Sequence, residues 1–318
     1  MLPNNDQTCG WINKLPKRTN INVVKGSLSC DWIIIGAGYT GLSAARQLGN
    51  MNPNIKIMLV DAQLAGEGAS SRNSGYLVDS TMNDGFVSSK NTDDYKAKCD
   101  LYSLGIKKVK EFVARHQVDC DWNESGKYYA SSIIKDVERL DRFSDRLNTL
   151  EIENHILYNS ELSQKLGTNF YKVALYTKGG VLLHPGKLVR AMVNSLPENV
   201  TLYENSPLLK WEEANNKINC IFQEASIEAA SIIFCTNGFL SSLGIEGRYS
   251  FPLLLTASMT RRLTDEEFNQ IGSPNEWGVL SIRPMGATVR MTNDRRILIR
   301  NTVSLHKNYT NIESNKNI

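Results

Sequence analysis

The sequence has no hydrophobic run long enough to cross a membrane. Its apolar stretches, such as Trp32–Ile35 and Val181–Leu183, are no longer than a strand, whereas a helix that spans a bilayer needs about 20 apolar residues. The N-terminus also lacks the apolar stretch of a secretory signal. We therefore predict no membrane span and a cytoplasmic location.

The cysteines do not form a recognisable metal or disulfide pattern. The six are Cys9, Cys30, Cys99, Cys120, Cys220 and Cys235. No two are spaced C-x-x-C, and no histidine lies near them at metal-ligand spacing. This pattern indicates reduced cysteines, as expected in the cytoplasm, and no metal site.

The charge is too small and too dispersed to indicate a polyanionic partner. The net charge is +3, with Lys and Arg spread along the whole chain, so we expect no nucleic-acid partner. Of the 318 residues, 41% are hydrophobic and 22% charged, as in globular proteins. A chain of this length is expected to form about two domains.

A βαβ unit is present near the N-terminus. The apolar run Cys30–Ile35 has the character of a buried parallel strand. A Gly-rich turn follows, and Leu42, Ala45 and Leu48 then recur at helical spacing up to Gly49, which we interpret as a helix stop. A second buried strand covers Ile55–Val60 and ends in Asp61. The order predicts one right-handed crossover unit.

The turn has the G-x-G-x-x-G spacing of dinucleotide-binding proteins. Gly36 permits a sharp turn, Gly38 lets backbone approach a pyrophosphate, and Gly41 lets the helix pack close to the strand. Asp61 lies 20 residues after Gly41, where a carboxylate accepts hydrogen bonds from the adenosine ribose and repels the 2′-phosphate of NADP. The alternative is a tight strand–helix turn in an α/β protein that binds no nucleotide.

A loop of small residues follows at Gly66–Gly75. Such residues let backbone amides approach a flat ring or a phosphate, and Arg72 adds a positive charge. The alternative is a surface loop with a solvated arginine. Because the loop directly follows the ribose-binding strand, we favour the ligand-binding interpretation and a flavin over a nicotinamide cofactor.

The rest of the chain alternates helices and strands. We predict helices over 93–116, with an apolar stripe that includes Tyr95, Leu101 and Leu104, over 134–149, and from Pro185 onward. Strands are predicted at Tyr128–Ser131, Ala174–Tyr176, Val181–His184, Val200–Tyr203 and Ser231–Cys235, with a hairpin of Lys217–Phe222 and Ser226–Ala229.

This order indicates an α/β fold in which a second domain is inserted in a discontinuous nucleotide-binding domain. We expect the first to be a Rossmann-like FAD-binding domain and the second an α+β substrate domain built on a mixed or antiparallel sheet. The expected boundaries are an N-terminal arm at 1–28, the FAD-binding domain at 29–112 and 185–244, the substrate domain at 113–184 and 245–303, and a polar tail at 304–318.

Taken together, these segments resemble the FAD-dependent amine and amino-acid oxidoreductases of the D-amino-acid oxidase superfamily. The resemblance rests on Gly36–Gly41, Asp61 and Gly66–Gly75, with weaker support from Gly179–Pro185 and from Thr236-Asn237-Gly238. Within the superfamily the sequence is most similar to the γ-glutamylputrescine oxidoreductases. The family pattern continues beyond the stretch that matches Asp294–Arg300, and nothing after Arg300 resembles it, so we expect a truncated or a naturally short chain.

The resemblance implies FAD as cofactor, a small amine or amino acid as substrate, and oxygen or another electron acceptor. The implied reaction is hydride transfer from the carbon next to the nitrogen to flavin N5, followed by hydrolysis of the imine. Arg72 and His184 are the candidate catalytic residues, although a histidine before Pro185 also fits a purely structural turn. The expected cofactor contacts are Gly36, Ala37, Gly38, Tyr39, Thr40, Gly41, Asp61, Ala62, Gly68, Ala69, Ser70, Ser71, Arg72, Asn73, Ser74, Gly75, Leu208, Thr236, Asn237 and Gly238. Two alternatives are a flavoprotein that binds FAD weakly or without turnover, and a nicotinamide-dependent dehydrogenase.

Overall fold

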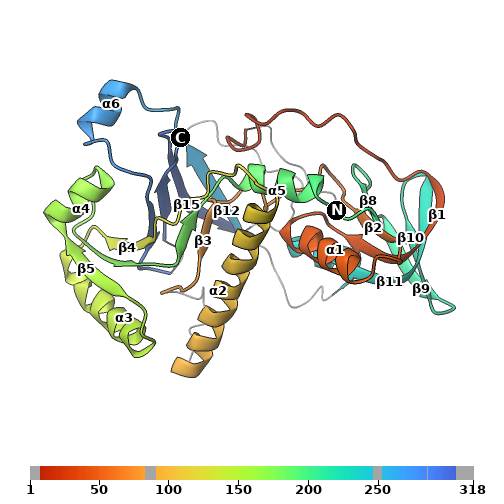
Figure 1. Cartoon of the computed structure of the whole chain (residues 1–318), viewed down its shortest axis with the longest axis horizontal. Coiled ribbons are helices and arrows are strands. Elements are labelled where there is room, and N and C mark those ends of the chain that lie inside the picture. The colour runs from red at the N-terminus through yellow and green to blue at the C-terminus, as the bar shows by residue number, and fades with distance from the viewer. Residues whose placement is uncertain (1–7, 83–90, 246–252, 285, 306–318) are drawn as a thin grey trace. The chain divides into compact units, whose positions relative to one another are not determined.

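The computed structural model describes residues 8–82, 91–245, 253–284 and 286–305 (Figure 1). The chain divides into two compact units. Among the described residues, unit 1 contains 8–73 and 185–245 with Leu253 and Leu305, and unit 2 contains 74–82, 91–184, 254–284 and 286–304.

Unit 1 is built on a six-stranded sheet with the order β8-β2-β1-β11-β10-β9. The first four strands run parallel, and β10 and β9 are antiparallel to their neighbours. Its elements are β1 (Gly26–Ile35), α1 (Tyr39–Met51), β2 (Ile57–Val60), α5 (Pro185–Asn194), β8 (Val200–Tyr203), β9 (Lys210–Ala214), β10 (Lys217–Ile221), β11 (Ala225–Phe234) and the 3₁₀ helix η2 (Asn237–Leu243).

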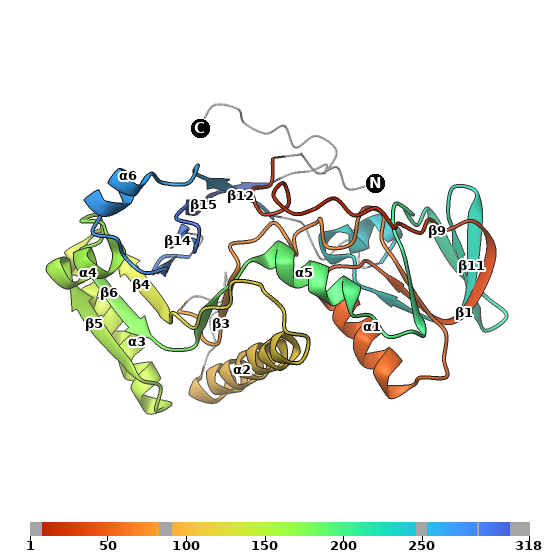
Figure 2. The same ribbon diagram turned by 45° about the horizontal axis from the view of Figure 1, so that its top comes forward.

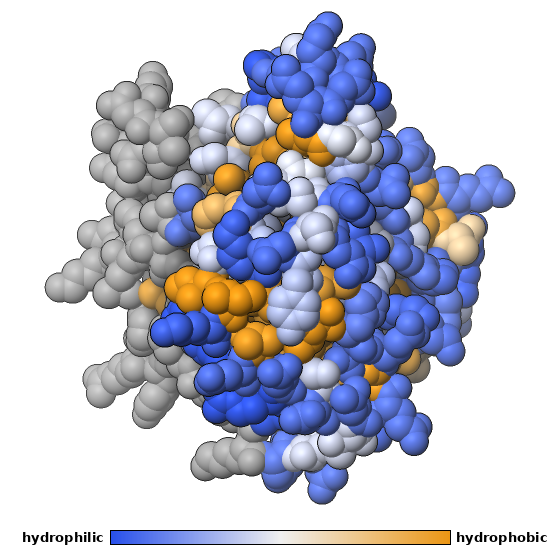
Figure 3. Space-filling view, turned by 90° about the vertical axis from the view of Figure 1, so that its left-hand side faces the viewer, coloured by the Kyte–Doolittle hydropathy of each residue, from blue (hydrophilic) through white to orange (hydrophobic). Residues whose placement is uncertain are grey.

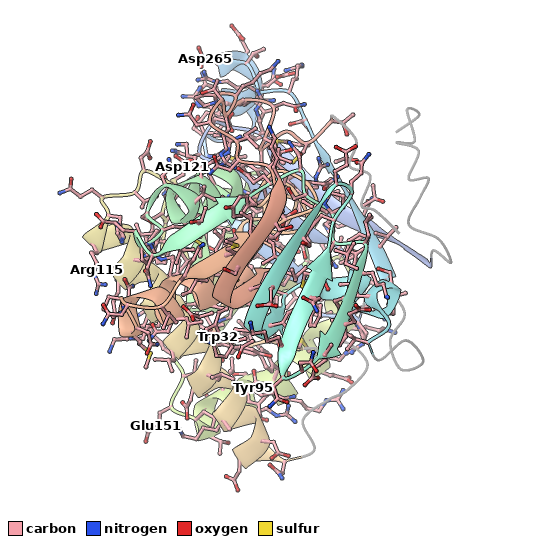
Figure 4. All side chains as sticks on the ribbon, turned by 90° about the vertical axis from the view of Figure 1, so that its right-hand side faces the viewer. Trp32, Tyr95, Arg115, Asp121, Glu151 and Asp265 are labelled. Atoms are coloured by element: carbon pink, nitrogen blue, oxygen red, sulfur yellow. The ribbon has the colours of Figure 1, made fainter. Side chains whose placement is uncertain are left out.

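The parallel part of this sheet is buried on both faces. Ile33 and Ile35 point into one core with Met58 and Val60, while Ile34, on the alternate face, is also fully buried. Helix α1 packs against β1, β2, β8 and α5 (Figure 1). Figure 4 shows the β9–β11 strands of this sheet beside β1. The strand–helix–strand unit expected from the sequence is thus confirmed.

Unit 2 is built on a seven-stranded mixed sheet with the order β12-β15-β14-β13-β4-β6-β5, and on a two-stranded β3-β7 sheet. In the large sheet β13 and β4 pair in parallel, and the other registered pairs are antiparallel. Its elements are β3 (Tyr76–Val78), α2 (Thr92–Arg115), β4 (Lys127–Ser131), η1 (Ile134–Asp136), α3 (Val137–Thr149), β5 (Asn154–Tyr158), α4 (Asn159–Leu166), β6 (Val173–Thr177), β7 (Gly180–Leu182), β12 (Leu253–Met259), α6 (Asp265–Gln270), β13 (Gly278–Ser281), β14 (Thr288–Met291) and β15 (Ile297–Leu305).

The two faces of the large sheet have separate cores. Along β4, Tyr128 and Ala130 pack with residues of α4 and α6, whereas Tyr129, between them, packs with residues of α2 and α3. Helix α3 lies along β5 and β6 (Figure 2). A parallel sheet in unit 1 and an inserted mixed sheet in unit 2 confirm the fold class expected from the sequence.

Several sequence-based boundaries were wrong. Helix α1 does not stop at Gly49 but continues to Met51, because Gly49 is buried and a Cβ there would lie 2.9 Å from Val200 Cγ2. The glycine serves close helix–strand packing. The segments predicted separately at Ser226–Ala229 and Ser231–Cys235 form the single strand β11.

Two further differences concern the arm and the long helix. The last residues of the predicted arm, from Gly26, already belong to β1. In α2 only Tyr95 and Cys99 are buried, while Leu101 and Leu104 of the predicted stripe are 66% and 50% exposed. The predicted stripe thus identified the buried Tyr95, but Leu101 and Leu104 of the same stripe lie exposed.

Residues 74–112, which we assigned to the FAD-binding domain, group with unit 2 in their described part. The reason is that β3 pairs with β7 and α2 contributes to a core of the large sheet. The polar tail predicted at 304–318 lies outside the described residues from 306 onward.

Candidate functional site

The Gly-rich turn connects β1 to α1 where backbone segments approach very closely. Gly36 has φ +99°, and a Cβ there would lie 2.5 Å from the carbonyl oxygen of Cys235 on the neighbouring strand end. A Cβ on Gly41 would lie 1.8 Å from the carbonyl oxygen of Gly36. Both positions therefore require glycine, Gly36 for its conformation and both for space.

The N-terminus of α1 is open to a ligand. Its cap, Gly38, makes no side-chain capping bond, and the backbone N–H of Tyr39 donates to Ser70 Oγ at 2.9 Å. In the described chain the next first-turn N–H groups, of Thr40 and Gly41, have no partner. Free N–H groups and the helix dipole favour an anion here.

Asp61, at the end of β2, faces the same turn. Its Oδ2 accepts from the Ala37 N–H at 2.7 Å, and its Oδ1 accepts from the Gln63 N–H at 2.9 Å. Burial raises the pKa of Asp61, the two backbone donors oppose that rise, and the charge of Glu204 adds to it. Each carboxylate oxygen keeps a second lone pair, which a ribose hydroxyl can use.

The loop after β2 forms compact turns against α1 and α5. Asn73 Nδ2 donates to the Ser70 carbonyl at 2.8 Å, and Arg72 Nε donates to the Glu67 carbonyl at 2.7 Å. A Cβ on Gly66 would lie 1.9 Å from Val189 Cγ1 of α5, so this glycine permits close packing. Ala62 lies between β2 and these turns, and Gly68 and Ala69 are exposed within them. The loop thus brings Ser70 and Arg72 to the segment that follows Asp61.

A third segment meets the turn at the end of β11. The Cys235 N–H donates to the Ile35 carbonyl at 2.7 Å, which holds the two strand ends together. Thr236 Oγ1 is buried without a hydrogen-bond partner among the described residues. Asn237 is exposed with φ +49°, and Gly238 follows in η2. Leu208, by contrast, lies in the core beneath the sheet.

These features fit a bound dinucleotide. Gly36 and Gly41 have no room for a side chain, the helix N-terminus has free donors, and Asp61 lies at the end of the adjacent strand. The orphaned Thr236 hydroxyl, next to Gly36, supplies a further polar group at this edge. The structure therefore brings together, within unit 1, the predicted residues of the turn, Asp61, the loop up to Asn73, and Thr236.

The remaining predicted residues, Ser74, Gly75 and His184, belong to unit 2. The Leu183 N–H donates to the Gly75 carbonyl at 2.9 Å, and the His184 N–H donates to the Cys120 carbonyl at 2.7 Å. The His184 side chain is buried. The hydrogen bond to Cys120 fixes the backbone of His184 just after the end of β7.

Arg290 of β14 was missed by the sequence reasoning. Its side chain is 1% exposed, and Nη1 donates to the carbonyls of Ser74, Gly75 and Leu183 at 2.9, 2.8 and 2.9 Å. Nη2 pairs with the buried carboxylate of Glu276. A single arginine within the short strand Thr288–Met291 was the available signal.

A second buried ion pair was also missed. Lys127, fully buried at the start of β4, pairs with Asp79 and donates to the Lys178 carbonyl at 2.9 Å. Burial lowers the pKa of Lys127, and the Asp79 charge opposes that change. A Cβ on Gly179 would lie 1.5 Å from Asp79 Oδ2, so this glycine makes room for the carboxylate. The pair links the β3, β4 and β7 segments.

Unit 2 also contains a cavity of about 700 Å³ over one face of its large sheet. Trp277, Val279, Val289 and other mostly apolar residues line it, and Arg283 lies at its polar part, paired with Asp136 at 3.0 Å. Figure 3 shows apolar side chains gathered on the side of the molecule that carries α3, α4 and β5. The volume lies in the range of small-molecule sites.

The described residues contain no helix long and apolar enough to cross a membrane. Within the same residues, no three His, Cys, Asp or Glu side chains come together as a metal site.

Comparison with known proteins places the sequence in a family. Four curated proteins are similar to it, of which two are described. γ-Glutamylputrescine oxidoreductase of Escherichia coli (strain K12) is 24% identical over 290 residues, covering 89% of this chain and 66% of that protein. Probable oxidoreductase OrdL of Haemophilus influenzae is 24% identical over 225 residues, covering 67% of this chain and 50% of that protein. The chain thus spans about half to two thirds of the length of these relatives.

Solved structures show the same fold. Glycine oxidase from Geobacillus kaustophilus aligns with a TM-score of 0.70 at 16% identity, covering 87% of this chain and 72% of that chain. L-proline dehydrogenase from P. horikoshii aligns with a TM-score of 0.69 at 13% identity, covering 87% and 71%. The model of the family described as DAO, FAD dependent oxidoreductase, matches residues 31–316. The family's dependence on FAD confirms the cofactor expected from the sequence. This chain belongs to the DAO family of FAD-dependent oxidoreductases.

Proposed function

We propose that the chain binds FAD through unit 1 and oxidises the C–N bond of a small amine or amino acid. The observation that carries this proposal is the arrangement of Gly36, Gly38 and Gly41 at the open N-terminus of α1, with Asp61 beside it. Membership of an FAD-dependent family supplies the reaction class. The amine class is supported by the names of a curated relative and of a structural neighbour, γ-glutamylputrescine oxidoreductase and glycine oxidase.

Each part of the site has a proposed task. The N–H groups of Thr40 and Gly41 bind the pyrophosphate, and Asp61 accepts the ribose hydroxyls. Arg72 lends positive charge to the flavin-binding loop, and His184 is a candidate substrate contact. FAD, when bound, supplies the two-electron acceptor for a hydride from the carbon next to the substrate nitrogen, and water then hydrolyses the imine.

The two units divide the work in this proposal. Unit 1 is the FAD-binding domain, and unit 2 is the substrate domain. The cavity lined by Trp277, Val279 and Val289 supports this division, since its apolar walls suit the hydrocarbon part of an amine. We accordingly expect amines with aromatic or branched aliphatic groups to be better substrates than compact ones such as glycine.

The test begins with the purified chain. We expect a yellow protein that releases FAD on denaturation and produces hydrogen peroxide, or reduces an added acceptor, with members of an amine panel. Release of NAD instead of FAD would contradict the proposal. Bound FAD without turnover on any amine or amino acid would favour the second interpretation, a flavoprotein that binds its cofactor without oxidising these substrates.

A further inference from the structure

The segment before β1 holds the flavin-binding loop in place. This N-terminal arm, residues 8–25, precedes the part of the chain that the family model matches, which begins at residue 31. We propose that the arm is a positioning element for the loop Gly66–Asn73, and that Trp11 is its principal residue. The inference rests on the proposed function, because that loop is assigned to the flavin.

The arm contacts the loop on both sides of Arg72. Trp11 Nε1 donates to the Asn73 carbonyl at 2.9 Å, and the Cys9 thiol donates to the Ser71 carbonyl at 3.6 Å. Trp11 is only 7% exposed, so its ring is packed as well as hydrogen-bonded. These contacts fix the backbone on which the Arg72 side chain is carried.

A buried carboxylate joins the arm to the beginning of the loop. Glu204 is 1% exposed, and its Oε1 pairs with Arg18 of the arm and accepts from the Ala65 N–H at 2.6 Å. A charge buried this deeply requires both partners. The loop is therefore held near both ends, through Ala65 at one and Asn73 at the other.

The arm itself is anchored to the rest of unit 1. Arg190 of α5 donates to the Pro16 carbonyl at 2.9 Å, and the Val24 N–H donates to Ser206 Oγ at 2.9 Å. These bonds lie on either side of Arg18 along the chain. Because the arm has its own attachments, it can hold the loop before any cofactor arrives.

A loop that is ordered in advance loses less conformational freedom on binding. Loss of the Trp11 N–H removes one hydrogen bond from the loop, so Trp11→Phe is expected to raise the dissociation constant of FAD about five- to tenfold. It also shifts the visible spectrum of the bound flavin, because the ring environment set by the loop changes. Thr19→Ala, an exposed change in the same arm with no bond in the described structure, is the matched control.

Two measurements on the full chain test the proposal. The first titrates FAD into the apoprotein of the wild type, Trp11→Phe and Thr19→Ala. The second follows trypsin cleavage after Arg72 in the same apoproteins. We expect Trp11→Phe to weaken FAD binding and to speed that cleavage several-fold over Thr19→Ala, with cleavage after Arg261 in unit 2 unchanged.

The outcomes separate the two hypotheses. Equal FAD affinity and equal cleavage after Arg72 in Trp11→Phe and the wild type would overturn the role of the arm and leave the proposed function standing. A wild type that takes up no FAD would refute the proposed function and the arm's link to the cofactor, whereas faster cleavage in Trp11→Phe would still show that the arm holds the loop. A lower melting temperature with an unchanged flavin spectrum and affinity would mean a purely structural role and would also overturn the proposal.

Discussion

Arg290 offers the sharpest test of how unit 2 is held together. Its guanidinium is buried, binds three backbone carbonyls at 2.8 to 2.9 Å and pairs with Glu276, which is itself 8% exposed. Arg290→Met leaves that carboxylate buried without its charged partner, while the Asn123 amide still donates to it at 2.9 Å. Breaking a buried pair by removing one member costs about 3–5 kcal/mol of unfolding free energy. With a urea slope of about 2 kcal/mol per M, the unfolding midpoint of unit 2 falls by about 2 M.

The assay is urea unfolding followed by circular dichroism, with two comparison variants. Arg261→Met removes one partner of an exposed pair with Glu267 and should leave the unfolding midpoint close to that of the wild type. Adding Glu276→Met to Arg290→Met removes the stranded carboxylate and should recover part of the loss. If Arg290→Met unfolds at the same urea concentration as Arg261→Met, the reasoning about this pair is refuted.

Three other predictions concern the candidate FAD site at Gly41 and Asp61 and the cavity of unit 2. Gly41→Ala should abolish FAD binding detectable by equilibrium titration, because its Cβ would lie 1.8 Å from the carbonyl oxygen of Gly36. The control Gly105→Ala, whose Cβ would have no atom within 4 Å, should bind FAD as the wild type does. Burial raises the pKa of Asp61 in the folded protein above 3.8, its value in the unfolded chain. Protonated Asp61 therefore adds fully to the free energy of unfolding at a pH below the unfolded-state pKa, and this contribution is lost as the pH rises through the folded-state pKa. The unfolding free energy of the wild-type apoprotein minus that of Asp61→Asn should therefore fall as pH rises above about 4, and a flat or rising difference would argue against a buried carboxyl. Val289→Phe, which fills part of the cavity, should raise KM for a bulky aromatic amine several-fold more than KM for methylamine. Leu104→Phe, on the exposed part of α2, should leave both KM values unchanged. An equal effect of Val289→Phe on the two KM values would show that the cavity does not bind the substrate.

Local signals were sufficient for the nucleotide-binding unit. The strand, turn, helix and second strand around Gly36 and Asp61 are adjacent in sequence, and each is specified by apolar runs or by a position that needs glycine. The spacing of apolar residues and of glycines therefore predicts this unit directly from the sequence. The roles of these residues toward FAD stay predictions until binding is measured.

Local sequence patterns were misleading where tertiary packing determined the role of a residue. Gly49 has the character of a helix stop in sequence, but Val200, about 150 residues later, sits against it and makes it a packing position. Leu101 and Leu104 continue an apolar stripe, yet α2 buries only residues of its first turns. Local sequence patterns do not show which neighbouring segment a helix face will pack against, because that is set by the tertiary structure.

The buried charges were invisible for the same reason. Three ion pairs, Arg18–Glu204, Asp79–Lys127 and Arg290–Glu276, each have at least one buried member. Nothing in the sequence around these residues indicates that burial. Each becomes a pair only when the chain folds, even for Arg290 and Glu276, which are 14 residues apart.

The sequence by itself determined the family, the FAD cofactor and the βαβ unit, because all three depend on short motifs whose geometry is local. Only the tertiary structure decided that the described residues of 74–112 belong with unit 2 and that the arm contacts the loop Gly66–Asn73. It also showed that buried ion pairs connect separate segments within each unit. Those features depend on long-range contacts, whose energies come from burial and charge pairing and leave no pattern along the chain.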